Sequence, residues 1–255
     1  MSLIEHTLEG KIDRVQIAID RLKAFEPPEG YYLAFSGGKD SQVIYELAKM
    51  SGVKFDAHFN FTTVDPPELL KFIKDFYPNV QWHRPEISMF KLIPKNLMPP
   101  TRMIRYCCSY LKERGGSGRI VITGIRSQES YKRSKRKMVE SCYKNPGKKY
   151  INPILDWTEA DVWEFIKGQK LKYCKLYDEG YKRIGCILCP MQRISGKLMD
   201  AKRYPKFYKA YLLAFKKMLI ERERKGKKTK WKTPEEVMNW WVYEPSNQKQ
   251  DTLFN

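Results

Sequence analysis

The sequence lacks any apolar run long enough to cross a bilayer, and it is poor in histidine and in acidic residues. Of 255 residues only three are histidine, and 48 lysines and arginines far outnumber the 29 acidic residues. A membrane span needs about 20 apolar residues in a row, and no stretch approaches that length. The opening segment, "MSLIEHTLEGKIDR", also lacks the apolar core of a secretion signal. We therefore expect a cytoplasmic protein that has no membrane partner.

Disulfide bonds are not expected either, although the sequence contains six cysteines. Thiols stay reduced in the cytoplasm, so cysteines there more often bind metals or take part in redox chemistry. A hydrophobic content of 42%, with 12 Phe, 16 Tyr and 6 Trp, is typical of a packed globular protein. The length allows one sizeable core, or a core with a small second lobe.

The net charge of +19 is concentrated in two segments. Residues 131–149 hold eight Lys/Arg and one Glu, and residues 202–232 hold thirteen Lys/Arg and two Glu. These two basic segments supply almost the whole net charge, so the rest of the chain is nearly neutral. Such concentration favours a polyanionic partner, most simply a nucleic acid. A solvated lysine-rich surface is the alternative interpretation.

Hydrophobic periodicity predicts alternating strands and helices. Strands are expected at residues 31–35, 55–63, 80–85 and 119–126, and helices at 9–25, 41–50, 66–77 and 156–168, followed by a long helix from 204. Strands that alternate with helices indicate a mostly parallel α/β sheet.

The turn between the first strand and its helix reads "SGGKDS", residues 36–41. A helix start offers free backbone N–H groups, and glycines let an anion approach them closely, so this turn predicts a phosphate site. Ser36 and Ser41 add hydroxyl donors, Lys39 adds a cation, and Asp40 can hold Mg²⁺ against the phosphates. The Walker A spacing is not met, because Gly37-Gly38-Lys39 are contiguous.

This turn resembles the PP-loop, S-G-G-x-D-S, of the ATP pyrophosphatase superfamily. Members of that superfamily split ATP between the α and β phosphates, and the loop holds the pyrophosphate. The resemblance therefore implies that ATP is bound by residues 36–41, with direct contacts from Ser36, Gly37, Gly38, Lys39, Asp40 and Ser41.

Two further segments resemble the phosphoadenylylsulfate (PAPS) reductase branch of that superfamily. They are "ITGIRSQESYKR" at 122–133 and "DWTEADVWEFI", followed by "LYDEGYKRIGCILCP", between residues 156 and 190. The resemblance implies a HUP-type (adenine nucleotide alpha hydrolase-like) parallel sheet flanked by helices in residues 1–195, with a basic helical C-terminal extension in residues 196–255. It also implies that the nucleotide or its acidic substrate is faced by Gly124, Arg126 and Arg133.

"TTVDPPE" stands where these reductases have another turn near the nucleotide, so Thr62, Thr63 and Asp65 are weaker site candidates.

Four cysteines form two close pairs, Cys107-Cys108 and Cys186/Cys189. On count alone they fit tetrahedral Zn²⁺ and a [4Fe–4S] cluster equally well. The arrangement resembles the [4Fe–4S] site of assimilatory adenylylsulfate (APS) reductases, and this favours the cluster. Cys142 and Cys174 match no motif; Cys142 could carry a persulfide, although a spare cysteine is the commoner case.

The reductases resolve sulfite through a cysteine in an E-C-G-x-H setting near the C-terminus, and residues 190–255 here contain no cysteine. Without that nucleophile the reductase reaction has no thiosulfonate intermediate. The remaining features resemble enzymes that insert sulfur into nucleic acids, most closely the ATP pyrophosphatase subunits of DNA phosphorothioation systems (DndC or SspD type). The resemblance to these subunits implies DNA rather than tRNA as the substrate. It also implies partners: a cysteine desulfurase or another sulfur donor, and further subunits of a modification complex.

In the expected reaction a nucleic-acid oxygen attacks the α-phosphate of ATP. Lys39, Arg126 and Mg²⁺ on Asp40 would stabilise the developing charge. Two other functions stay open: a PAPS or APS reductase that uses an external thiol, and a non-catalytic subunit that binds nucleotide and cluster.

Overall fold

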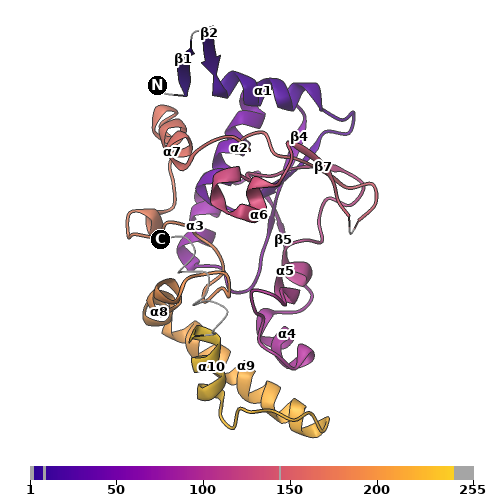
Figure 1. Cartoon of the computed structure of the whole chain (residues 1–255), viewed down its shortest axis with the longest axis vertical. Helices are drawn as coiled ribbons and strands as arrows, with labels where there is room; N and C mark the ends of the chain where they lie inside the picture. Colours follow the sequence, from indigo (N-terminus) through magenta and orange to yellow (C-terminus); the bar gives the residue numbers. More distant parts are fainter. Residues whose placement is uncertain (1–2, 8–9, 144, 244–255) are drawn as a thin grey trace. The chain divides into compact units, whose positions relative to one another are not determined.

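The computed structural model describes residues 3–7, 10–143 and 145–243 (Figure 1). The chain forms two compact units, each built from several segments. The first, here called the sheet unit, comprises Met1–Asn60, Pro67–His83 and Gly115–Ile184. The second, here called the helical unit, comprises Phe61–Pro66, Arg84–Arg114 and Gly185–Asn255.

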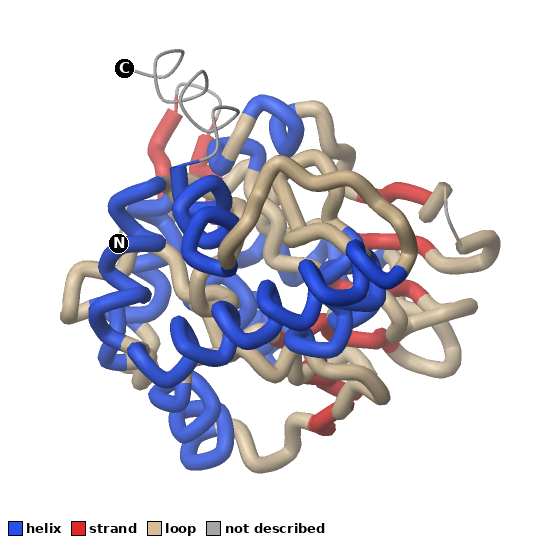
Figure 2. The backbone as a smooth tube through the Cα atoms, turned by 90° about the horizontal axis from the view of Figure 1, so that it is seen from below, coloured by secondary structure: helices blue, strands red, loops and turns tan. Residues whose placement is uncertain are grey.

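The sheet unit is built on a six-stranded sheet with the strand order β5-β4-β3-β6-β8-β7. All neighbouring strands are parallel except β7, which runs antiparallel to β8 at the edge. This arrangement confirms the predicted mostly parallel α/β sheet. The strands are short, and helices and loops carry most of the chain (Figure 2). Their bounds are β3 Tyr31–Phe35, β4 Phe55–Asn60, β5 Gln81–His83, β6 Ile120–Ile122, β7 Val139–Ser141 and β8 Lys149–Ile151.

Four helices of this unit, α1, α2, α3 and α7, lie where the apolar periodicity predicts helices, whereas the short α6 was not predicted. Their bounds are α1 Arg14–Ala24, α2 Lys39–Ser51, α3 Pro67–Phe76, α6 Tyr131–Ser134 and α7 Glu159–Gly168, with 3₁₀ turns η1 Ser127–Glu129 and η2 Lys175–Tyr177. Helix α2 contacts α1, α7 and β3, so it lies in the middle of its layer. The β3 strand is almost fully buried, and the Tyr31 hydroxyl donates to the Leu22 carbonyl of α1 at 2.7 Å.

The predicted helix at 9–25 is too long at its start. Residues before Arg14 instead form a hairpin of β1 (Ile4–Thr7) and β2 (Gly10–Asp13). The Asp13 carboxylate accepts hydrogen bonds from the N–H groups of Val15 and Gln16, at 3.1 and 3.0 Å. Asp13 is therefore the N-cap that fixes where α1 begins.

The helical unit contains α4 (Met89–Asn96), α5 (Tyr106–Leu111), α8 (Ile194–Arg203), α9 (Pro205–Arg224) and α10 (Pro234–Tyr243). Helix α9 contacts α4, α8 and α10, and its side chains Tyr211, Phe215 and Met218 are buried. The predicted apolar stripe on this long helix therefore packs into the core, and the predicted helical C-terminal region is present. The positive φ of 62° at Gly226 follows the end of α9, where glycine tolerates the left-handed conformation.

The compact units follow different boundaries from the sequence-based division at residues 195 and 196. Residues 61–66, 84–114 and 185–195 belong to the same unit as the C-terminal helices. The proposed extent of the family domain, residues 1–195, stays a prediction, and so does the extension at 196–255. None of the helices in the described ranges has the length and apolar character needed to cross a membrane.

Candidate functional site

Residues 36–41 connect β3 to α2, as the sequence predicts. Gly37 has φ 71°, and a Cβ added there would lie 2.8 Å from side-chain atoms of Leu69 and Ile73 in α3. Both facts require glycine, because other residues rarely adopt this φ and have no room for a side chain. Gly38 is the N-cap of α2 and supplies no side-chain cap, so the first N–H groups of the helix are left open to a ligand or another chain segment.

The two serines of the loop lie together. The Ser36 hydroxyl donates to the Ser41 hydroxyl at 3.1 Å, and Ser41 donates to the Gly38 carbonyl at 2.8 Å. The Gly38 N–H points at the Ser36 hydroxyl, at 3.4 Å. Because Ser36 is exposed and Ser41 is buried, Ser36 is the hydroxyl that a bound phosphate would reach first.

The Lys39 side chain is folded inward. It is 4% exposed; its ammonium donates to the Lys182 carbonyl at 2.9 Å and lies 3.4 Å from the Glu159 carboxylate. The same ammonium lies 5.5 Å from the centre of the Tyr177 ring, a cation–π distance. The loop cation therefore has internal partners, and a phosphate ligand would have to replace or join them.

The structure brings Asp40, Gly124 and Arg126 together. The Arg126 guanidinium, 3% exposed, donates from Nε to the Asp40 carboxylate at 2.6 Å. A Cβ added to Gly124 would lie 2.8 Å from the Asp40 carbonyl oxygen. Gly124 is thus needed because the segment after β6 passes directly against the first turn of α2. Its close approach is what places Arg126 on Asp40.

Arg133 lies in the same neighbourhood, on α6. Its guanidinium pairs with the Glu129 carboxylate, and burial lowers the Arg133 pKa. Arg183 lowers it further by like-charge repulsion, while the charges of Glu129 and Asp40 act in the opposite direction. Arg133 and Arg183 are therefore close enough to influence one another, and Asp40 is close enough to influence Arg133.

Sequence reasoning missed four of these residues: Glu159, Tyr177, Lys182 and Arg183. All lie inside segments quoted for their resemblance, "DWTEADVWEFI" and "LYDEGYKRIGCILCP". The signal for them was present, but the motif alone did not show which of its side chains turn toward the loop.

The structure leaves the Mg²⁺ prediction at Asp40 untested. Among the described residues, no three His, Cys, Asp or Glu side chains are grouped so as to hold a metal ion. A nucleotide-bound Mg²⁺ needs only one or two protein carboxylates, because phosphates and water complete its shell. Asp40, with 23% of its side chain exposed, fits that limited role.

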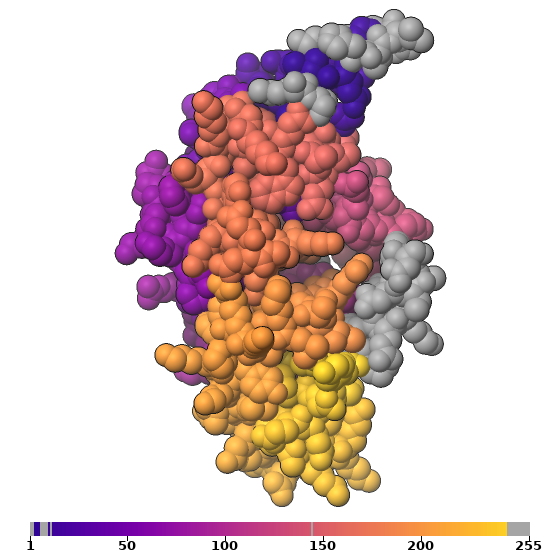
Figure 3. Space-filling model, turned by 90° about the vertical axis from the view of Figure 1, so that its left-hand side faces the viewer, coloured from indigo at the N-terminus to yellow at the C-terminus, as the bar shows by residue number. Residues whose placement is uncertain are grey.

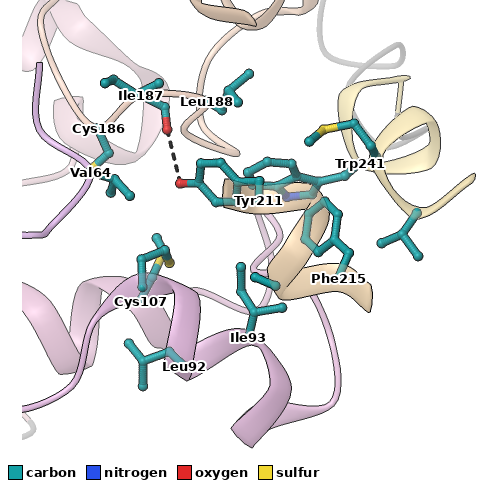
Figure 4. Close-up of a cluster of buried hydrophobic side chains, with 14 of the residues drawn as sticks. Val64, Leu92, Ile93, Cys107, Cys186, Ile187, Leu188, Tyr211, Phe215 and Trp241 are labelled. Atoms are coloured by element: carbon teal, nitrogen blue, oxygen red, sulfur yellow. Dashed lines mark hydrogen bonds between the residues drawn. The ribbon is translucent and has the colours of Figure 1, made fainter. Parts of the chain in front are cut away.

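All four cysteines of the two close pairs lie in the helical unit. Cys107 and Cys108 are on α5; Cys186 and Cys189 are in the loop before α8. Cys107 and Cys186 are buried at the edge of the apolar cluster drawn in Figure 4, and Cys108 and Cys189 are half-buried. Their charges influence one another, so they share one neighbourhood, although they are not arranged as a ligand set.

The environment favours a thiolate at Cys108. A hydrogen bond from Cys107 and the Arg105 guanidinium, 3.4 Å from Cys108 Sγ, lower the Cys108 pKa. Burial raises the pKa of Cys186 to about 11. The charges of Cys186 and of Asp65 raise the pKa of Lys112, so this unit places a cation beside the thiols.

The C-x-x-C loop has a fixed backbone. Leu188 has the left-handed φ of 56°, and its N–H donates to the Asp200 carboxylate of α8 at 2.8 Å. The Ile187 N–H donates to the Val64 carbonyl at 2.8 Å, and Tyr211 donates to the Ile187 carbonyl at 3.2 Å (Figure 4). These bonds fix the backbone of the two residues that lie between Cys186 and Cys189.

The weaker candidates lie beside the cysteines. The Cys186 thiol donates to the Thr62 hydroxyl at 3.5 Å, and the Thr62 N–H donates to the Asp65 carboxylate at 2.6 Å. Burial raises the pKa of Asp65. The Thr63 hydroxyl accepts from the Met89 N–H at 3.0 Å. Their contacts place these residues in the cysteine neighbourhood of the helical unit.

The two remaining cysteines lie in the sheet unit. Cys174 is 1% exposed, and burial raises its pKa, as for a structural thiol. Cys142 is half-buried and accepts a weak hydrogen bond from Tyr150 at 3.7 Å.

Comparison with known proteins agrees with the resemblance. The family profile described as the phosphoadenosine phosphosulfate reductase domain matches residues 30–192. An uncharacterised protein of Methanocaldococcus jannaschii is 32% identical over 200 residues, which cover 70% of this chain and 40% of that protein. The adenosine 5′-phosphosulfate reductase of Oceanobacillus iheyensis is 29% identical over 170 residues, 62% of this chain and 70% of that one. This chain spans less than half of that protein and of a second uncharacterised M. jannaschii protein, which is 30% identical: 40% and 47% of their lengths.

Two solved structures share the fold. The phosphoadenylyl-sulfate reductase of Candida auris, in complex with phosphate, superposes with a TM-score of 0.51 at 20% identity. The match covers 66% of this chain and 87% of that one. A mutant of Candida glabrata FMN adenylyltransferase gives 0.50 at 17% identity, over 68% of this chain and 61% of that one.

The close approach of Gly124 to α2 yields a direct prediction. Gly124→Ala should destabilise the fold by about 1–3 kcal/mol, because its Cβ would collide with backbone rather than with a flexible side chain. Thermal melting measures this effect.

Gly196→Ala in α8 is the matched control. An added Cβ there meets only the Gln192 side chain, at 3.6 Å, and alanine should stabilise this helix by about 0.5–1 kcal/mol. A Gly124→Ala protein with an unchanged melting temperature would contradict the assigned packing.

Proposed function

Because the chain belongs to the phosphoadenosine phosphosulfate reductase domain family, we propose that it is a PP-loop ATP pyrophosphatase. It converts ATP to AMP and pyrophosphate, and it adenylates a nucleic-acid oxygen for sulfur incorporation. One observation supports this most directly: the loop at residues 36–41 opens the N-terminus of α2 while Lys39 and the Asp40–Arg126 pair flank it. That combination suits a polyphosphate better than any neutral ligand.

The proposed reaction uses these groups in distinct roles. The β and γ phosphates bind at residues 36–41, where backbone N–H groups and the Ser36 hydroxyl donate to them. Lys39 leaves the Lys182 carbonyl to pair with phosphate oxygens. Arg126, held beside Asp40, stabilises the charge that develops on the α-phosphate as pyrophosphate departs. Mg²⁺ bound by Asp40 would supply further neutralisation of the phosphates.

Arg133 and Arg183 extend the positive potential away from Arg126. Because the Arg133 guanidinium is paired with the Glu129 carboxylate, we propose that Arg133 orders the site and does not contact a phosphate directly. An acidic second substrate would be attracted to these arginines, which fits a nucleic-acid backbone.

The first basic segment supports nucleic acid as that substrate. In residues 131–149, Lys132, Lys135 and Lys137 are exposed, and the segment begins at α6, directly after the turn that carries Arg126. Tyr131 is 64% exposed, with the Lys135 ammonium 4.4 Å from its ring centre. Exposed aromatic rings among lysines are typical of surfaces on which bases stack and phosphates pair.

The second basic segment, residues 202–232, lies on α9 and the segment after it. Lysines of this segment are exposed to solvent along the helix. The segment contributes to the orange and gold atoms of Figure 3. We propose that the substrate is DNA, which undergoes phosphorothioation, rather than tRNA, which would undergo thiolation. A cysteine desulfurase or another donor would deliver the sulfur, and further subunits of a modification complex would be partners. A cytoplasmic location fits these partners.

A second candidate function is a sulfonucleotide reductase that uses an external thiol. The relative from O. iheyensis, named as an adenosine 5′-phosphosulfate reductase, favours it. Sulfite release from APS or PAPS in the presence of thioredoxin would establish this alternative. A non-catalytic nucleotide-binding subunit is the third candidate; it would keep its cellular function after Asp40→Ala.

We also propose a [4Fe–4S] cluster on Cys107, Cys108, Cys186 and Cys189. The donor set supports it, because four thiols of one unit influence one another and Cys108 is stabilised as the thiolate that iron binds. The side chains must rearrange to ligate, and the cationic groups of Arg105 and Lys112 would offset the negative charge of a thiolate-bound cluster.

The cluster proposal predicts brown protein after anaerobic purification, with about four iron atoms per chain. Cys186→Ser and Cys189→Ser should each lower the iron content, whereas Cys174→Ser, at the buried thiol of the sheet unit, should leave it unchanged. Iron analysis and absorption spectra measure this. If protein kept free of oxygen contained one zinc ion per chain and no iron, the proposal of a [4Fe–4S] cluster would be contradicted.

The catalytic proposal predicts AMP and pyrophosphate as products of ATP, with the rate raised by nucleic acid. Lys39→Ala should lower ATP affinity by about 1.5–3 kcal/mol, because it removes a charge-assisted phosphate contact. Lys49→Ala, an exposed lysine at the other end of α2, is the control and should bind ATP normally. Chromatography of the products decides the reaction: ADP and phosphate would contradict the proposal.

The nucleic-acid proposal predicts binding that weakens steeply with salt. Replacement of Lys132, Lys135 and Lys137 by Gln should flatten the slope of log affinity against log salt, by about 0.9 for each lysine that pairs with a duplex phosphate. The triple change at Lys23, Lys71 and Lys74, exposed lysines outside both basic segments, removes the same charge and should leave the slope unchanged. If both triple variants change the slope equally, binding depends on net charge and not on this segment.

A further inference from the structure

The hydroxyl of Tyr177 lies at the N-terminus of α2, where the proposed phosphate site begins. It accepts a hydrogen bond from the backbone N–H of Lys39 at 2.9 Å. A Cβ added to Gly38 would come within 3.4 Å of the same hydroxyl oxygen. One of the open N–H groups of the helix is therefore satisfied by a side chain from η2, 138 residues away in the sequence.

This hydroxyl is a neutral phenol with its proton still to donate. Burial raises the Tyr177 pKa, so the group stays protonated at any ordinary pH. Its oxygen accepts from Lys39, and no acceptor in the described part of the chain takes its proton. A hydroxyl placed in this way can accept from the loop and donate to a bound anion at the same time.

The ring that carries the hydroxyl is held by its neighbours. Trp163 of α7 packs edge-on against it, with ring centres 5.0 Å apart, and the Lys39 ammonium lies 5.5 Å from its centre. Tyr173 completes the aromatic cluster, at 5.2 Å from Trp163. Because the ring is fixed, the hydroxyl position does not depend on a ligand, and it is ready before one arrives.

We propose that Tyr177 is a phosphate-contacting residue of the nucleotide site, and that its hydroxyl bridges the Lys39 N–H to an oxygen of the bound pyrophosphate group. The proposal rests on the proposed function, since it assumes that residues 36–41 hold phosphates. It adds a side-chain donor to the loop that the PP-loop motif itself does not contain. It also makes Tyr177 a specificity residue for the pyrophosphate part of ATP rather than for the adenosine part.

Tyr177→Phe tests this, because it removes the hydroxyl and keeps the ring against Trp163. The probes are inorganic pyrophosphate and a non-hydrolysable ATP analogue with a methylene bridge between the α and β phosphates, titrated by calorimetry with Mg²⁺. Both affinities should fall about tenfold or more, as expected when a hydrogen bond to a charged group is removed. Binding of AMP should change less than twofold.

Tyr173→Phe is the matched control. It also removes a hydroxyl from the same aromatic cluster, but that hydroxyl bonds the Asp178 carboxylate at 3.0 Å and not the loop. Its pyrophosphate affinity should stay within twofold of the parent protein. An affinity for pyrophosphate that is unchanged or higher in Tyr177→Phe would overturn the proposal and leave the proposed function standing. A parent protein that binds neither probe would overturn both.

A measurement on the unchanged protein tests the proposal even if the Tyr177→Phe variant fails to fold. A phenol that donates to an anion absorbs at longer wavelength, so pyrophosphate should shift the tyrosine absorption of the parent protein to the red. The shift should persist in Tyr173→Phe. Saturating pyrophosphate that binds without any shift would overturn the proposal.

Discussion

The open N–H groups at the start of α2 are the constraint on which the candidate site depends. A helix start that is not capped by its own side chain must be satisfied from elsewhere. Here Gly38 provides no cap, and the Tyr177 hydroxyl takes its place at the Lys39 N–H. The same site holds two buried cations, Lys39 and Arg126, and each has an internal oxygen partner. A phosphate chain would supply oxygens to the Tyr177 hydroxyl and to both cations at once.

These internal partners explain how the site stays folded without a ligand. An unpaired buried cation costs several kcal/mol, so Lys39 and Arg126 would destabilise an empty site. The Lys182 carbonyl and the Glu159 carboxylate pair with the Lys39 ammonium, and the Asp40 carboxylate pairs with the Arg126 guanidinium. Ligand binding would replace the internal partners of these cations with phosphate oxygens, so its free energy is only the difference between the two sets of contacts. We therefore expect a moderate affinity, with an exchange of partners during turnover.

Much of the sheet unit was predictable because its signals are local. The alternation of apolar strands with amphipathic helices predicts β3, α2, β4 and α3 within a few residues, and the glycines of residues 36–41 mark the turn. The structure places Arg126 beside Asp40, and its role toward a nucleotide stays a prediction. The β1–β2 hairpin and the short strands β7 and β8 were not predicted, because three or four residues carry too little periodicity.

Other features depend on contacts between distant residues. Lys39 meets Tyr177 and Lys182 only because the segment after α7 returns to the loop, and no spacing in the sequence records this. The cysteine pairs were visible in the sequence, but the Lys112 and Asp200 side chains near them were not. Asp65 was predicted as a candidate near the nucleotide and not beside the cysteines. The helical unit is assembled from three stretches of chain, so a linear boundary cannot describe it.

The central claim is that this chain activates a nucleic-acid oxygen with ATP so that sulfur can replace it. Mass spectrometry of digested DNA and RNA tests this most directly, in cells that contain the protein, cells that lack it and cells that carry Lys39→Ala. The account predicts sulfur-containing dinucleotides from DNA only where the unchanged protein is present. Identical sulfur content in all three, for DNA and for RNA, would contradict it.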